Sequence, residues 1–281
     1  MLIIAHRGSP FKAPEHSLAA FTIAVMEGAN RIEMDLRVSR DGVIFVCHDA
    51  YTGRIGYPNL TLSESEASDL DQVRLENGEK LLRLSEVISW WQQLPSPSNS
   101  LRHVSLNLEL KISSSQIITA LSRLIEPLSP SDINSIIISS RHTSALIKCQ
   151  QNQGLSQIPR AYLWESPSRK NLNTLTSQES SDQIPHEWLV IQQRMNMVGS
   201  QIIHPRAIDW ESSLGWRAKA EGYLVYTWSA MMDQERQQQC SLWHHLYQLH
   251  VDGHCTNCPL EFSRFLRQKM IDNKINTNSH H

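Results

Sequence analysis

The sequence predicts an α/β protein of one domain, folded as a closed (β/α)8 TIM barrel, and two observations predict this fold. Short apolar runs typical of β-strands alternate along the chain with longer helical patterns, which is the arrangement of βα units around a parallel sheet. Eight of these runs stand out as principal strands, the number that closes a barrel of this type. A chain of 281 residues also has enough material for one large domain with a buried core.

The principal strands are expected near residues 2–6, 31–37, 104–110, 135–139, 159–164, 187–192, 222–228 and 251–256. An additional apolar run at residues 43–48 should form a strand that pairs antiparallel with the second one.

Helices are expected between the strands, at residues 17–27, 85–93, 114–125, 142–151, 210–221 and 233–249. Ser17 and Ser114 stand at the start of two of them, where a serine hydroxyl can accept hydrogen bonds from free backbone N–H groups. Residues 165–186 are rich in Ser, Asn and Gln and show no clear pattern.

Two segments lie outside the alternation of strands and helices. Residues 50–80 look like a surface insertion with short elements of its own, placed after the second strand and its antiparallel partner. Residues 269–281 are expected to form a disordered tail. The barrel should therefore occupy residues 1–268 without a linker.

Composition excludes several classes of protein. With 19% charged residues and a formal net charge of -2, the chain has no basic field that would attract nucleic acid. Its longest apolar runs fall short of the roughly 20 residues that a membrane span needs. Five cysteines, an odd number without framework spacing, fit a reducing compartment. The first residues lack the pattern of a secretory signal, so we expect a cytoplasmic protein.

Acidic side chains gather on the second and third principal strands. On the second, Glu33 and Asp35 alternate with apolar neighbours and therefore share one face of the strand. On the third, Asn107, Glu109 and Lys111 share a face in the same way. Active sites of (β/α) barrels form at the carboxyl ends of the strands, so these side chains should meet inside the barrel mouth.

Three carboxylates that converge in a partly dry pocket repel one another unless a cation neutralises them. Ligation by oxygen alone selects hard ions such as Mg²⁺ or Ca²⁺. We therefore expect Glu33, Asp35 and Glu109 to hold a divalent metal. The alternative for any one of these acids is a salt bridge with Arg31, Arg37 or Lys111.

Two histidines end strands beside this acidic cluster. His6 ends the first strand, and His48 ends the additional strand. Imidazole titrates near neutral pH, so either ring can donate or accept a proton during catalysis. Arg7 and Lys111 add positive charge suited to a phosphate, and Gly8 gives the backbone room to turn. Together these groups indicate phosphoester chemistry.

These residues make the sequence resemble the glycerophosphodiester phosphodiesterase family, whose fold is a (β/α)8 barrel. The resemblance extends along most of the chain. It is carried by His6-Arg7-Gly8, Pro14-Glu15-His16-Ser17 (Pro-Glu-Asn-Thr in the family), the pair Glu33 and Asp35, His48-Asp49, the pair Glu109 and Lys111, Ser139-Ser140, Trp228, and Asp252-Gly253 with Thr256 and Pro259.

The chain departs from the family motifs at a few positions. His16 replaces Asn, Ser229-Ala230-Met231 replaces the Thr-Val-Asn that follows the tryptophan, and Asn257 replaces the Asp of the closing motif. We expect these changes to affect substrate preference and local loop packing more than the chemical step.

The resemblance implies metal-dependent hydrolysis of a small-molecule glycerophosphodiester to glycerol 3-phosphate and an alcohol. It implies acid and base roles for His6 and His48, phosphate binding by Arg7 and Lys111, and packing of Trp228 against the glycerol or the head group. Two alternatives remain at this stage. One is a barrel that cleaves a lysophospholipid or another phosphodiester, and the other is a catalytically silent barrel that binds a phosphorylated ligand.

Overall fold

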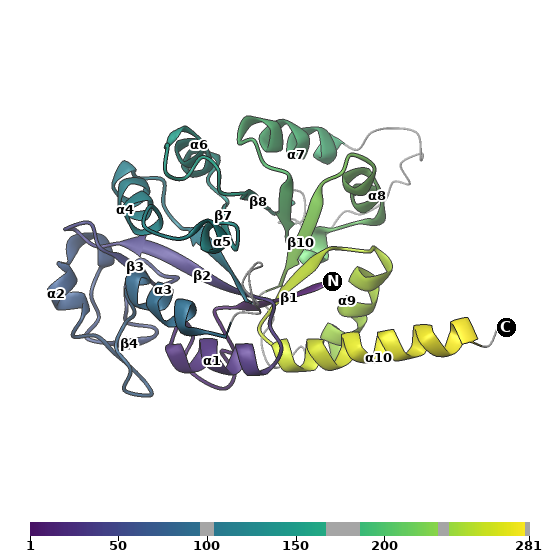
Figure 1. Cartoon of the computed structure of the whole chain (residues 1–281), viewed down its shortest axis with the longest axis horizontal. Coiled ribbons are helices and arrows are strands. Elements are labelled where there is room, and N and C mark those ends of the chain that lie inside the picture. The colour runs from purple at the N-terminus through teal and green to yellow at the C-terminus, as the bar shows by residue number, and fades with distance from the viewer. Residues whose placement is uncertain (96–103, 167–185, 230–235, 279–281) are drawn as a thin grey trace, which may run out of the picture.

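The computed structural model describes residues 1–95, 104–166, 186–229 and 236–278 of the chain. Within these ranges, eight parallel strands form a closed barrel (Figure 1), as the sequence predicts. The barrel strands are β1 (Leu2–His6), β2 (Arg31–Val38), β6 (Ser105–Leu110), β7 (Ile136–Ser140), β8 (Arg160–Trp164), β9 (Ile202–Pro205), β10 (Leu224–Trp228) and β11 (Gly253–Thr256).

Pairing between the first strand and both of its neighbours closes the barrel. Strand β1 pairs with β11 on one side and with β2 on the other, and His6 lies opposite Glu33 in the second pairing. Strand β3 (Ile44–Val46) pairs antiparallel with the far end of β2, which confirms the additional strand expected from the sequence.

The strand expected at residues 187–192 is wrong. These residues lie in helix α7 (His186–Met197), where Trp188, Ile191 and Met195 are buried at spacings of three and four residues, the period of a helix face. The sixth barrel strand is β9, which has four residues and ends in Pro205. A run this short, next to a longer apolar helix, does not stand out in the sequence.

The other helices outside the insertion surround the barrel strands (Figure 1). Ser17 and Ser114 cap two of them, as expected, by accepting hydrogen bonds from Ala20 N and Ile117 N. The helices are α1 (Leu18–Met26), α3 (Leu84–Gln93), α4 (Ser115–Ile125), α5 (Pro130–Ile133), α6 (Thr143–Gln151), the 3-10 turn η3 (Ala207–Asp209), α8 (Ser212–Ala220), α9 (Arg236–Gln248) and α10 (Pro259–Asn278).

The segment between β3 and α3 forms the surface insertion and has a small core of its own. It contains β4 (Gly56–Tyr57), η1 (Leu62–Glu64), α2 (Ala67–Leu70) and β5 (Arg74–Leu75), and β4 pairs antiparallel with β5. Leu62, Leu70 and Val73 are buried in a cluster that also includes Phe45 and Cys47. The insertion is therefore packed against the end of β3, beside the barrel mouth.

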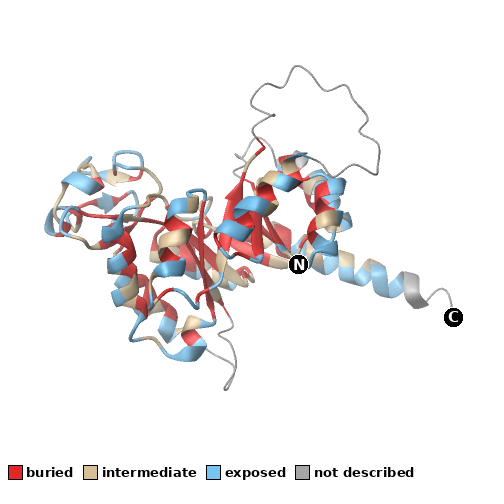
Figure 2. Ribbon diagram, turned by 90° about the horizontal axis from the view of Figure 1, so that it is seen from above, coloured by how far each residue is buried: buried red, intermediate tan, exposed pale blue. Residues whose placement is uncertain are grey.

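The expected disordered tail is helical as far as the structure describes it. Helix α10 continues to Asn278 and projects from the barrel (Figures 1 and 2). Gln268 donates a hydrogen bond to Asp272 one turn later, and Asn273 donates one to the Tyr247 hydroxyl of α9, both at 2.9 Å. These contacts support a helical backbone where composition alone suggested disorder. Residues 279–281 lie outside the described part of the chain.

The strands alternate between two environments, as their period of two requires. Outward residues such as Met34 and Leu108 pack against the helices in the main core, while Ile4, Ile137 and Ile202 fill the barrel interior. Figure 2 shows the buried strands inside a more exposed layer of helices. Among the described helices, none is long and apolar enough to cross a membrane.

Candidate active site

The carboxyl ends of the barrel strands surround a cavity of about 200 Å³. Most of its lining residues are those that the sequence singles out, together with four others. The lining residues are His6, Arg7, Glu33, His48, Glu109, Lys111, Arg141, Leu163, His204, Trp228 and Cys255.

Strand register brings the three expected carboxylates together. Asp35 of β2 lies opposite Glu109 of β6, and Glu33 lies one inward position earlier on β2. One carboxylate oxygen from each residue can be chosen so that all three atoms lie within 4.8 Å of one another. All three side chains are buried, so their charges are poorly screened by water.

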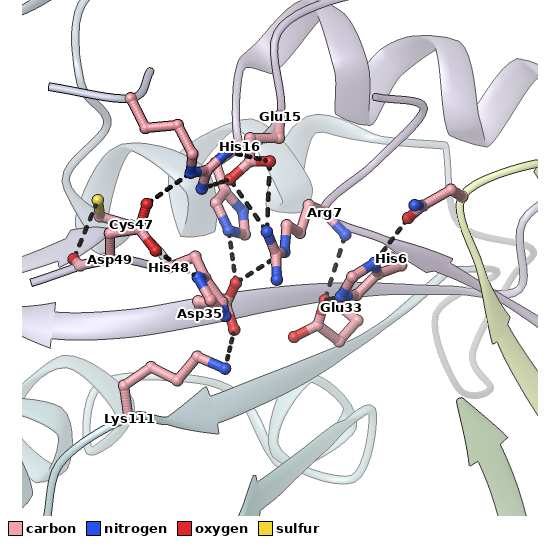
Figure 3. Close-up of polar contacts among 12 residues, drawn as sticks. His6, Arg7, Glu15, His16, Glu33, Asp35, Cys47, His48, Asp49 and Lys111 are labelled. Atoms are coloured by element: carbon pink, nitrogen blue, oxygen red, sulfur yellow. Dashed lines mark hydrogen bonds and ion pairs between the residues drawn. The ribbon is translucent and has the colours of Figure 1, made fainter. Parts of the chain in front are cut away.

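Two cations contact the cluster (Figure 3). Lys111 Nζ lies 2.9 Å from Asp35 Oδ1, and Arg7 Nε lies 3.0 Å from Asp35 Oδ2. Lys111 Nζ also lies 2.6 Å from Glu109 Oε1. The salt bridge to Lys111, considered above as an alternative to a metal, is therefore present. Two cationic side chains still leave three ionised carboxylates with an excess negative charge.

That excess charge alters the pKa values of the cluster. Burial and the charges of Asp35 and Glu109 raise the pKa of Glu33 well above its ordinary value. Burial and the charge of Asp35 likewise raise the pKa of Glu109. Burial would also raise the pKa of Asp35, but contacts from His16, Lys111 and Arg7 lower it well below the usual range.

The residues present fit a bound divalent cation. Glu33 Oε1 is buried and accepts no hydrogen bond in the described part of the chain. Arg7 and Lys111 do not neutralise all three carboxylates, and one carboxylate oxygen has no hydrogen-bond partner among the described residues. Such a group of oxygen donors is what a hard cation requires. Glu33, Asp35 and Glu109 can therefore act together as oxygen ligands.

His6 is oriented by a neutral partner. Its Nδ1 donates a hydrogen bond to Asn257 Oδ1 at 2.6 Å, and its Nε2 lies 4.0 Å from Glu33 Oε2. Burial and the charge of Arg7 lower the pKa of His6 to about 3. In a neutral ring with the proton on Nδ1, Nε2 has a free lone pair on the side of the acidic cluster.

The turn after His6 places Arg7 and requires a glycine next to it. Gly8 has a φ of +90°, and a Cβ at this position would lie 2.7 Å from the backbone carbon of Ala20 in α1. Only glycine fits this close approach. The Arg7 backbone N–H donates to Glu33 Oε2 at 3.2 Å, so the turn also contacts the acidic cluster.

His48 is oriented by a carboxylate that the insertion holds in place. Its Nδ1 donates to Asp49 Oδ1 at 2.7 Å, and Arg54 Nε donates to Asp49 Oδ2 at 2.5 Å. The other two nitrogens of Arg54 donate to the Glu15 carboxylate at 2.6 and 3.0 Å. Glu15 also accepts from Arg7 at 3.2 Å. Arg54 thereby connects His48 to Arg7 through two carboxylates.

Comparison with known proteins identifies the family of this chain. The model of the glycerophosphoryl diester phosphodiesterase family matches residues 6–261, which is most of the chain. The chain belongs to this family.

Solved structures of the family share its fold. A phosphodiesterase from Oleispira antarctica, solved in complex with the product sn-glycerol-3-phosphate, superimposes with a TM-score of 0.76 at 23% identity, covering 95% of this chain and 97% of that one. A glycerophosphodiester phosphodiesterase structure from Galdieria sulphuraria gives 0.75 at 20% identity, with the same coverage of 95% and 97%.

Curated relatives match over a short segment. A probable glycerophosphodiester phosphodiesterase 1 of Mycobacterium tuberculosis is 47% identical over 47 residues, which is 17% of this chain and 17% of the relative. A glycerophosphodiester phosphodiesterase of Caldanaerobacter subterraneus is 43% identical over 53 residues, or 19% and 22% of the two chains. These alignments therefore span about a fifth or less of the relatives' length.

Two of the departures from the family motifs lie inside the site. Asn257 accepts the hydrogen bond from His6, and His16 Nε2 lies 2.9 Å from Asp35 Oδ2. Both changes therefore contact groups expected to act in the chemical step. Met231, the third changed position, lies outside the described residues.

Two residues in or near the cavity of this chain, His204 and Arg54, were missed from the sequence. His204 lines the cavity, but the strand that carries it was not recognised. Arg54 was missed because its role depends on contacts with Glu15, 39 residues earlier. Polar residues at the carboxyl ends of barrel strands are candidates for the active site. This rule would have indicated His204 if β9 had been identified.

If Arg54 orients His48, replacing Arg54 should lower the catalytic rate. The change Arg54→Gln removes the donors that hold Asp49 and Glu15, so kcat should fall by roughly 10-fold to 100-fold with a smaller change in KM. Arg40→Gln is the matched control, because Arg40 also binds a glutamate, Glu66, but does so at the exposed surface. Equal kinetics for the Arg54 variant and wild type would exclude a positioning role.

Proposed function

We propose that this chain hydrolyses glycerophosphodiesters to glycerol 3-phosphate and an alcohol, with a divalent cation, Mg²⁺ or Ca²⁺, bound in the site. The observation that carries the proposal is one cavity lined by Glu33, Glu109, two histidines, Arg7 and Lys111, with the Asp35 carboxylate grouped with the two glutamates, in a chain of this family. The related Oleispira antarctica enzyme, solved with sn-glycerol-3-phosphate, supports a product of this class.

Glu33, Asp35 and Glu109 would hold the cation. When bound, it would polarise phosphoryl oxygens and lower the pKa of a coordinated hydroxyl, which belongs either to water or to the glycerol unit. The unpaired oxygen of Glu33 and the raised pKa values of Glu33 and Glu109 support this assignment.

His6 and His48 would share the proton transfers. Burial lowers the pKa of both rings, so each is neutral and able to accept a proton at neutral pH. Asp49 stabilises a positive charge on His48, whereas Asn257 offers His6 only an amide dipole. The two rings therefore respond differently to protonation.

Arg7 and Lys111 would stabilise negative charge that grows on the non-bridging phosphoryl oxygens. Both are already held by carboxylates at the cavity wall, so little reorganisation is needed when substrate binds. Trp228, at the end of β10, lines the same cavity and would pack against the organic part of the substrate.

We also propose a cytoplasmic location. All five cysteines are free thiols, and Cys47, Cys149, Cys255 and Cys258 are buried. Unpaired cysteines in this number support a reducing compartment.

The reaction is tested by identifying the phosphorus product with ³¹P NMR. With metal present, glycerophosphoethanolamine should yield glycerol 3-phosphate and ethanolamine, not phosphoethanolamine and glycerol. Lysophosphatidylethanolamine should react much more slowly, since it carries an acyl chain. Faster turnover of the lysolipid would contradict the proposed substrate, and binding of either diester without turnover would indicate a silent barrel.

A further inference from the structure

One histidine in the cavity is not used by the proposed chemistry. His204 of β9 is 2% exposed and lies on the inward side of the strand, with Ile202 of the barrel interior two residues before it. Neither of its ring nitrogens has a hydrogen-bond partner in the described part of the chain. Buried polar groups in folded proteins are rarely left in this state, so the ring is in place for a partner that the protein itself does not supply.

The neighbours of His204 make this end of the cavity neutral. Leu163, Trp228 and Cys255 line the cavity with it and carry no charge. The ionised lining residues stand on or directly after β1, β2, β6 and β7, the last of these being Arg141. Leu163 is the direct neighbour of His204 in the sheet, and the Tyr226 ring packs edge-on at 6.4 Å. Trp228 Nε1 is also buried, and no acceptor for it lies among the residues that the structure describes. The cavity thus combines a charged end, suited to phosphate, with a neutral end that has free hydrogen-bonding groups.

The protonation state of His204 determines which ligand group suits it. Burial and the charge of Arg31 lower the pKa of His204 to about 3, so the ring is neutral at physiological pH. A neutral imidazole has one N–H donor and one acceptor nitrogen. An alcohol hydroxyl has the same pair of functions, whereas a quaternary ammonium group has neither and a phosphate dianion only accepts.

We propose that His204 is a specificity-determining residue that hydrogen-bonds a hydroxyl group of the substrate's glycerol unit at the neutral end of the cavity. This inference rests on the proposed function. It states that His204 makes the site prefer a substrate that carries a hydroxyl group. Trp228 Nε1 is a second donor for the same unit.

The test compares two phosphate monoesters that differ only in hydroxyl groups, sn-glycerol 3-phosphate and n-propyl phosphate. Their binding is measured by calorimetry at saturating Mg²⁺ on the full chain, for wild type, His204→Phe and His204→Gln. Phenylalanine fills the space of the ring without hydrogen bonds, and glutamine keeps a neutral donor and acceptor. The melting temperature of each variant is recorded to establish that it is folded.

Wild type should prefer glycerol 3-phosphate over propyl phosphate. In His204→Phe, affinity for glycerol 3-phosphate should fall about 3-fold to 10-fold, the usual effect of one lost neutral hydrogen bond, while affinity for propyl phosphate stays unchanged. His204→Gln should recover part of the preference. Unchanged preference in His204→Phe, or equal loss for both ligands, would overturn the inference.

Hydrolysis of glycerophosphoethanolamine by the wild type distinguishes failure of the proposed role of His204 from failure of the proposed function. If wild type turns this diester over but His204→Phe keeps the full hydroxyl preference, only the role of His204 fails. If wild type neither binds the two phosphates nor turns the diester over, the proposed function fails and this inference fails with it.

Discussion

Replacing His6 by alanine should lower kcat for a glycerophosphodiester by about 10²-fold to 10⁴-fold, the usual contribution of a general acid or base. The reason is geometric: His6 Nε2 faces the acidic cluster, and its tautomer is held by the hydrogen bond to Asn257. Loss of the ring removes a proton-transfer group but no carboxylate, so binding of the cation should persist. Steady-state kinetics with saturating metal measure the effect.

His245→Ala is the matched control for this variant. His245 is exposed on α9 and is not among the residues that line the cavity. Its replacement should leave kcat within about twofold of wild type, as expected for a surface substitution away from the site. A His6 variant that retains wild-type kcat would show that this ring is not part of the chemical step.

Replacing Glu33 by glutamine should abolish metal-dependent activity and metal-dependent stabilisation together. A ligand present at 100 times its dissociation constant stabilises a folded protein by about 2.7 kcal/mol, so saturating Mg²⁺ or Ca²⁺ should raise the melting temperature of the wild type. Glutamine has nearly the shape of Glu33 but removes one anionic ligand. The melting temperature of the variant should therefore show little response to either ion.

The same variant should be no less stable than wild type when metal is absent. The pKa of Glu33 is raised in the folded state, so its contribution to stability is present at low pH and is lost as pH rises through that raised value. Without metal, wild type should lose stability over this pH range more than the glutamine variant does. Glu76→Gln, at an exposed position of the insertion, controls for loss of one negative charge. A normal metal response in Glu33→Gln would refute the ligand assignment.

The features that could be predicted from the sequence are those determined by the alternation of neighbouring residues along a strand. Period-two alternation on β2 and β6 is enough to place Glu33, Asp35 and Glu109 on the inner face, because every barrel strand alternates in this way. The mouth of the barrel then follows from strand direction. The ends of the first strand and of the additional strand added His6 and His48 in the same region.

The parts that were missed depend on contacts distant in sequence. Asn257 meets His6 across 251 residues, and Arg54 reaches Glu15 across 39 residues, so neither contact is visible in a local window. The misassigned sixth strand has a different cause. Helix α7 has an apolar run that resembles a strand, and the true strand β9 is too short to compete with it. His204 was missed with that strand.

Release of glycerol 3-phosphate from glycerophosphoethanolamine by the wild-type chain should be measured with Mg²⁺, with Ca²⁺ and with EDTA. His6→Ala serves as the matched inactive variant. Release that requires a divalent ion, stops with EDTA and is nearly absent in the variant is the expected result. Equal release in EDTA, or no release with either ion, would contradict the account of a metal-dependent glycerophosphodiester hydrolase.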